Sequence, residues 1–196
     1  MNLSSLPFAL HWVGTPVESS GDGDSLTIVA GPRTDWFVDP GTGDAKLDAP
    51  GLVGRTKSDF LFSARVEVDF ASTFDAGVLA VWRDEQTWAK LCFEYSPDGE
   101  AMVVSVVTRT TSDDCNSTVI AGNAVWLRIA RIGQQFAFHA SNDGTAWRLV
   151  RHFALTADDE IELGFAAQSP LGGGCAARFT EIRFSPTTLA DLRSGL

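Results

Sequence analysis

Cysteine is scarce in this chain of 196 residues, which contains only Cys92, Cys115 and Cys175. They are odd in number and widely spaced, and no Cys-x-x-Cys or Cys/His pair accompanies them. The pattern therefore predicts neither a disulfide framework nor a zinc site. We expect three reduced thiols in a cytoplasmic protein, with no metal and no other cofactor.

Long apolar runs are also missing. No stretch approaches the roughly 20 consecutive apolar residues that a membrane-spanning helix needs. The first thirty residues contain no basic segment followed by an apolar one, which a secretory signal would require. We therefore expect a soluble, unexported protein that does not act at a membrane.

Positive charge is in short supply. The chain has 15 Lys and Arg against 25 Asp and Glu, a formal net charge of −10, and a pI near 4.6. An excess of negative charge opposes binding that is driven by neutralising a polyanion. Nucleic acid and anionic membranes are therefore not expected partners.

Helical periodicity is rare, and short apolar runs alternate with turn residues. In residues 58–70 the side chains of Phe60, Phe62, Ala64, Val66, Val68 and Phe70 share one face, which predicts a long half-buried strand. Further strands are predicted at 76–83, 88–95, 102–109, 124–131, 135–140, 147–153, 160–168 and 175–184. A short helix is predicted only at 186–192, with Ser185 as N-cap and Pro186 at its first position.

Roughly a dozen short strands with turns every 8–12 residues are typical of an antiparallel β-sandwich of jelly-roll type. The length suits a single all-β domain spanning residues 1–196. We find no internal repeat and no low-complexity segment.

A hairpin of residues 88–95 and 102–109 has two unlike faces. Period-2 alternation places Leu91, Phe93 and Tyr95 on one face and Trp88, Lys90, Cys92 and Glu94 on the other. If the four-residue turn at 96–99 pairs Tyr95 with Glu100, Lys90 lies opposite Ser105. Arg109 then lies further along the same polar face.

The neighbouring segments add to this face. Pairing of Arg83 with Thr87 would place Trp82 opposite Trp88, although a slip of one residue would turn Trp82 to the other side. Residues 112–116 are predicted to form a polar loop, residues 169–174 a glycine-rich one, and at least one of the two is expected to rim this face, with Asp113 directed toward Arg109 or Lys90. The predicted ligand-binding residues are Trp82, Trp88, Lys90, Glu94, Ser105, Arg109, Ser112 and Asp113.

Known catalytic patterns are incomplete. Glu67 and Asp69 match the first two carboxylates of a glucanase-type Glu-x-Asp-x-x-Glu pattern, but the third position is Ser72. The acid/base carboxylate of a double displacement is therefore missing. There is no Gly-x-Ser-x-Gly. We interpret Glu67 and Asp69 as a solvated strand face and assign no catalytic residue.

Short motifs occur in an order that resembles one family. They are Thr34-Asp-Trp-Phe37, Ser58-Asp-Phe60, Phe74-Asp-Ala-Gly77, Trp88-x-Lys90 with Glu94, Val106-Val-Thr108, Ser112-Asp113, Ser141-x-Asp-Gly144 and Ser169-Pro170. Over about residues 30–185 the chain resembles the uncharacterised family that includes the yeast regulation-of-enolase protein. The resemblance implies a concanavalin A-like lectin/glucanase sandwich, and fold does not fix function.

The leading hypothesis is binding of a small carbohydrate or related polar metabolite on the polar face. Tryptophan rings can stack on a sugar ring, and charged groups can hydrogen-bond its hydroxyls or an acidic substituent. Alternatively, Lys90 and Glu94 form a surface ion pair and the tryptophans pack beneath a loop. A second class of function, suggested by the resemblance, is a regulatory module that binds a metabolic enzyme. A third is a sugar-acting enzyme with Glu94 as acid or base.

Overall fold

The computed structural model describes residues 3–156 and 160–196, and all the regular elements in them are β-strands. The first eight are β1 (His11–Val13), β2 (Glu18–Asp22), β3 (Ser25–Ala30), β4 (Trp36–Val38), β5 (Ala45–Leu47), β6 (Gly51–Thr56), β7 (Phe60–Val68) and β8 (Ala76–Asp84). The other eight are β9 (Thr87–Tyr95), β10 (Ala101–Arg109), β11 (Thr111–Val119), β12 (Ala124–Ile132), β13 (Gln135–Ser141), β14 (Arg148–Ala154), β15 (Ile161–Gln168) and β16 (Cys175–Ser185).

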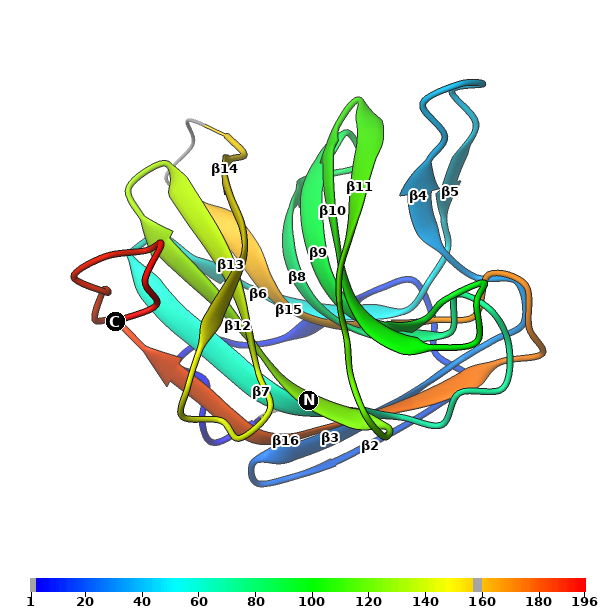
Figure 1. The fold of residues 1–196 in the computed structure, drawn as a ribbon, viewed down its shortest axis with the longest axis horizontal. Coiled ribbons are helices and arrows are strands. Elements are labelled where there is room, and N and C mark those ends of the chain that lie inside the picture. Colours follow the sequence, from blue (N-terminus) through cyan, green and yellow to red (C-terminus); the bar gives the residue numbers. More distant parts are fainter. Residues whose placement is uncertain (1–2, 157–159) are drawn as a thin grey trace.

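Two seven-stranded antiparallel sheets form a sandwich of jelly-roll type (Figure 1). The first sheet has the order β1-β6-β15-β8-β9-β10-β11, and the second has the order β14-β13-β12-β7-β16-β3-β2. Neighbours in both sheets include strands far apart in sequence, such as β7 with β16 and β8 with β15. The predicted all-β sandwich is confirmed.

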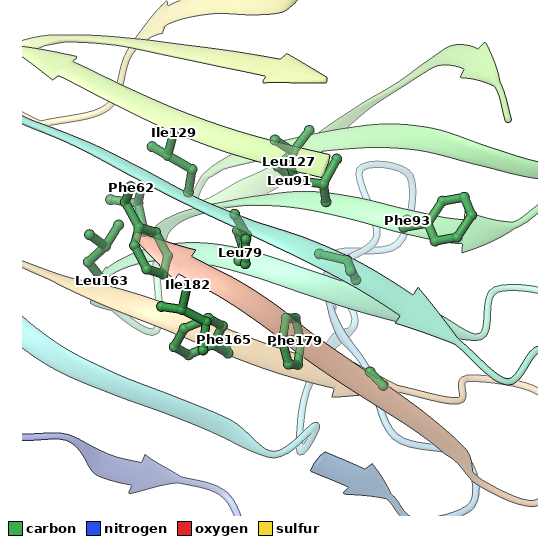
Figure 2. Close-up of a cluster of buried hydrophobic side chains, with 14 of the residues drawn as sticks. Phe62, Leu79, Leu91, Phe93, Leu127, Ile129, Leu163, Phe165, Phe179 and Ile182 are labelled. Atoms are coloured by element: carbon green, nitrogen blue, oxygen red, sulfur yellow. The ribbon is translucent and has the colours of Figure 1, made fainter. Parts of the chain in front are cut away.

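The core lies between the sheets and follows the period-2 pattern of the sequence. Along β7, Phe60, Phe62, Ala64, Val66 and Val68 are buried, and the residues between them are partly exposed. Figure 2 shows how Phe62 and Ile129 of the second sheet meet Leu79 and Phe165 of the first. We call the side of the first sheet that packs on this core its inner face.

The opposite side of the first sheet, its outer face, is partly covered as well. Strands β4 and β5 form a separate hairpin, which in Figure 1 rises beside β9–β11 on the side away from β12–β14. Trp36 and Val38 of this hairpin pack in one cluster with Val78, Ala80 and Val104. Because both faces are covered, seven consecutive residues of β9, from Trp88 to Glu94, are buried.

The segment after β16 forms no helix, so the helix predicted at 186–192 is wrong. Leu189 and Leu192 pack on Ala130 and Ala137 of the second sheet. The Leu192 carbonyl is bonded to His139 Nε2 at 2.7 Å. A carbonyl held by a side chain of the sheet stabilises an irregular path in place of a helical one. Among the described residues, no helix is long and apolar enough to span a bilayer.

Candidate functional site

The pairing of β8 with β9 brings two predicted site residues together. Trp82 lies opposite Trp88, and Ala80 lies opposite Lys90, as the sequence predicted. Lys90 and Glu94 lie two and six positions after Trp88 on β9 and point to the same side. Trp82, Trp88, Lys90 and Glu94 therefore share the outer face. Leu91 and Phe93 point to the core, which confirms the two unlike faces of the hairpin.

The pairing of β9 with β10 differs from the prediction by one residue. Tyr95 pairs with Ala101 rather than Glu100, because the turn contains five residues and closes with Ser96 N–H donating to the Glu100 carbonyl at 2.8 Å. Lys90 therefore lies opposite Val106. A slip of one residue turns every side chain of a strand to the other face.

This shift removes Ser105 and Arg109 from the polar face. Ser105 lies opposite Leu91 and is fully buried on the inner face. Arg109 lies opposite Thr87 on the inner side, where its guanidinium donates to the Ala154 carbonyl at the end of β14. The prediction that these two side chains share a face with Lys90 is wrong.

The tryptophan end of the outer face is filled. Trp82 and Trp88 stack with their ring centroids 6.3 Å apart, and Trp36 of the hairpin packs on Trp82 at 4.7 Å. Trp88 is 0% exposed. A Cβ added to Gly51 would lie 2.3 Å from the Trp36 ring, so only glycine leaves room for this ring. The three tryptophan rings pack against one another and offer no open surface on which a sugar ring could stack.

Lys90 is the charged centre of the site and is 2% exposed. Its ammonium donates to Asp35 Oδ1 at 3.1 Å and to Gln168 Oε1 at 2.8 Å, and it lies 5.9 Å from the Trp88 ring centroid. Burial, the largest single effect, lowers the pKa of Lys90, but the neighbouring groups, led by the carboxylate of Asp35, together outweigh it, and the net shift is upward. Lys90 is therefore a fixed cation.

A pocket of about 150 Å³ opens beside this ammonium. Its walls come from the β4 hairpin, from β9–β11, and from the chain near β8 and β15. The lining residues are Asp35, Phe37, Phe74, Lys90, Glu94, Val104, Val106, Asp114 and Gln168. The pocket thus combines one cation and three carboxylates with apolar and aromatic walls.

Glu94 is the unusual member of this lining. It is 9% exposed, and no described residue forms a hydrogen bond with its carboxylate. Burial raises the pKa of Glu94 to about 7, with Lys90 opposing the shift and Asp35 and Asp114 adding to it. Its oxygens are not among the fully buried atoms that lack a partner, so they open into the pocket. At neutral pH this group is divided between its charged and protonated forms.

The segment predicted as a polar loop at 112–116 is the edge strand β11. Ser112 does lie on the outer face, where its hydroxyl bonds Thr108 Oγ1 at 2.9 Å and accepts from Val38 N–H at 2.9 Å. It thereby ties the β4 hairpin to the sheet. Thr108 pairs with Trp88, so this bond lies at the tryptophan end.

Asp113 and Asp114 point to opposite sides of β11. Asp113 pairs with Arg151 of β14, Oδ1 to Nη2 3.1 Å, so its predicted approach to Arg109 or Lys90 is wrong. Asp114 lies opposite Val106 and faces the pocket. The carboxylate that rims the site is therefore the one next to the predicted residue.

A larger hollow of about 380 Å³ lies near the turn after β13. There Ser141 Oγ donates to Asp143 Oδ1 at 2.9 Å, and that carboxylate accepts from Thr145 and Ala146 N–H, which keeps the pKa of Asp143 low. These polar groups satisfy one another, and none of them is a buried charge. The smaller pocket beside Lys90 is thus the stronger candidate.

Asp35, Gln168, Asp114, Phe37 and Phe74 were not predicted as site residues. Asp35, Phe37 and Phe74 belong to motifs that carry the family resemblance, and this signal pointed to them without giving a role. Within the described part of the chain, no group of three or more His, Cys, Asp or Glu side chains is placed to hold a metal ion.

Fold and site together define an antiparallel β-sandwich with a small charged pocket on the outer face of one sheet. The chain belongs to the family described as "protein of unknown function (DUF1349)", whose model matches residues 12–187. A search of curated proteins yields no match.

Solved structures share this architecture. A functionally unknown protein from Saccharomyces cerevisiae superposes with a TM-score of 0.84 and 26% identity, covering 90% of this chain and 95% of the yeast chain. The GH43 protein of the Bacteroides ovatus xyloglucan locus has a TM-score of 0.71 at 17% identity, covering 94% of this chain and 38% of its own. The GH43 protein BlXynB of Bacillus licheniformis, as the K247S mutant, has a TM-score of 0.68 at 15% identity, covering 89% and 36%. The chain thus spans little more than a third of these two hydrolases, and at such identity the likeness is one of fold alone.

Proposed function

We propose that this protein binds a small carbohydrate or a related polyhydroxy metabolite in the pocket beside Lys90. The observation that carries the proposal is the buried Glu94 carboxylate, which lines the pocket and receives no hydrogen bond from the described residues. Its oxygens open into the pocket and accept from no donor of the described residues, so they are free to accept hydrogen bonds from a ligand. The hydroxyl groups of a sugar donate such bonds.

The chemistry of the walls suits this ligand class. Glu94, Asp114 and Asp35 offer acceptors, and Lys90 is a fixed donor. Phe37 and Phe74 provide apolar surface for the carbon–hydrogen side of a ring. A pocket of about 150 Å³ is smaller than the range of about 300–1,000 Å³ usual for drug-sized ligands. We therefore expect a ligand no larger than a monosaccharide.

The position of Arg109 narrows the class further. With Arg109 on the inner side of the sheet, three carboxylates surround one ammonium in the pocket. An acidic substituent would meet net repulsion there, so sugar acids are disfavoured. We propose a cytoplasmic setting for this binding, because Cys92 and Cys175 are free and buried, which suits a reducing compartment.

Adjacent carboxylates on β11 provide the test. Binding of neutral monosaccharides and polyols is measured by calorimetry on the unmodified protein, on Asp114→Asn and on Asp113→Asn. Because Asp114 faces the pocket and Asp113 faces Arg151, the first change should weaken binding at least about fivefold and the second less than about twofold. Equal effects of the two variants on binding would contradict the proposal.

A further inference from the structure

We infer that the ligand of this pocket carries a cationic amine beside its hydroxyl groups, as an amino sugar or a small amino alcohol does. This inference rests on the proposed function and names the ligand class more closely. The structural basis is an uncompensated carboxylate, Glu94, which is nine-tenths buried and lines the pocket next to a second carboxylate, Asp114.

The charges of the pocket do not balance. Lys90 and Asp35 form an ion pair at 3.1 Å and cancel each other. Glu94 and Asp114 remain, Asp114 lies close enough to disfavour the charge of Glu94, and no second cationic side chain lines the pocket. A neutral ligand would leave this excess in place. An ammonium group would compensate it.

The donors and acceptors point the same way. The Lys90 ammonium has three N–H donors. Two of them bond Asp35 Oδ1 and Gln168 Oε1, which leaves one N–H for a ligand oxygen. Glu94 and Asp114 are acceptors when ionised and call for donors. A ligand with an oxygen acceptor next to a group rich in donors fits both demands, and a primary amine supplies three donors from a single atom.

Titration in the empty pocket supports this assignment. The charged groups that face Glu94 are Lys90 on its own strand, Asp35 before β4 and Asp114 on β11, and the buried Cys92 thiol lies between Lys90 and Glu94. Burial raises the pKa of Glu94 to about 7, so without a ligand the carboxylate is partly neutralised by a proton. Binding of an ammonium should release that proton.

The experiment compares matched pairs of probes that differ by the exchange of a hydroxyl group for an amine. Glucosamine is compared with glucose, and 3-amino-1,2-propanediol with glycerol, by calorimetry on the full chain at about pH 7 and up to about 10 mM. Each amine should bind at least tenfold more tightly than its neutral counterpart. Repeating the titration in buffers of different ionisation enthalpy should show proton release with the amines only.

Two variants locate the effect. Glu94→Gln keeps the shape of the side chain and removes its charge, so it should abolish the advantage of the amines. Glu100→Gln removes an exposed carboxylate in the turn of the same hairpin and should leave the advantage unchanged. Tighter or equal binding of the neutral probes would overturn the amine inference and leave the proposed function standing. Failure of all four probes to bind would overturn both.

Discussion

Lys90 Nζ lies 3.1 Å from Asp35 Oδ1, and the two partners are unequally buried, with 2% of the lysine side chain and 19% of the aspartate side chain exposed. Breaking such a pair is costly mainly through the charge that stays behind, and the cost grows with its burial. The two halves of this pair should therefore have different effects on stability when each is removed.

Asp35→Asn should destabilise the fold more than Lys90→Met. The first leaves a buried ammonium whose hydrogen-bond partners are all neutral, and we expect a loss of about 3 kcal/mol in the free energy of unfolding. The second removes the deeper charge, keeps most of the side-chain volume and leaves an aspartate that water can reach, so about 1 kcal/mol is expected. Urea unfolding at neutral pH measures both.

The same hairpin offers a control for this comparison. Lys46 pairs with Asp48 at 2.8 Å, with about half of each side chain exposed. Lys46→Met should change the free energy of unfolding by less than about 1 kcal/mol. If Lys90→Met proves at least as harmful as Asp35→Asn, the lysine charge itself stabilises the fold and the argument from burial is wrong.

The pH dependence of stability should contain a contribution from Glu94 with a definite sign. The pKa of Glu94 is raised from 4.5 to about 7 by burial, so the folded state holds a proton that the unfolded state has released. This contribution is fully present below about pH 4.5 and is lost as the pH rises through about 7. In Glu94→Gln this loss should vanish.

Urea unfolding at acidic and mildly alkaline pH tests the sign. Relative to the unmodified protein, Glu94→Gln should gain stability between about pH 4.5 and 8, by as much as about 3 kcal/mol. Glu100→Gln serves as the control at an exposed position. If Glu94→Gln instead loses stability relative to the unmodified protein as the pH rises, the carboxylate is stabilised in its charged form by Lys90.

Trp88→Ala should lower the thermal stability of the fold. The ring is 0% exposed and lies against Trp82 and Trp36, so its removal leaves a cavity on the outer face. We expect a loss of about 3–5 kcal/mol. Thermal unfolding followed by circular dichroism measures it, and Trp88→Phe should recover part of the loss. An unchanged midpoint for Trp88→Ala would mean that this cluster is loosely packed.

The sandwich could be predicted from the sequence because its strands follow a local pattern. In β7 every second side chain from Phe60 to Val68 is buried, and the pairing of Trp82 with Trp88 follows from the short link between their strands. Both features depend only on neighbours in sequence. Alternation and turn residues report such neighbours directly.

The composition of the site could be predicted only in part. The turn at 96–100 contains Ser-Pro-Asp-Gly, which satisfies the chemistry of a four-residue turn, yet Glu100 belongs to the turn as well. One additional residue was enough to exchange Ser105 and Arg109 for Val104 and Val106 on the outer face. Alternation cannot detect such a shift, because valines and polar residues both occur on each face of β10.

The hydrogen-bond partners of Lys90 could not be predicted from local sequence patterns. Asp35 lies 55 residues before it and Gln168 lies 78 residues after it. Asp35 belongs to a motif that gives it no role, and Gln168 does not stand out in sequence from other polar residues at strand ends. Their convergence follows from the order of the strands in the first sheet and from the hairpin that covers its outer face.

That convergence has a kinetic consequence. The hairpin β9–β10 joins neighbouring segments, so it can form while the Lys90 ammonium is still hydrated. Contacts of long sequence separation close their loops late. We therefore expect Asp35→Asn and Gln168→Ala to speed unfolding and leave the refolding rate nearly unchanged. The pocket would then be the last part of the molecule to assemble. A bound ligand would slow unfolding and leave the folding rate unchanged.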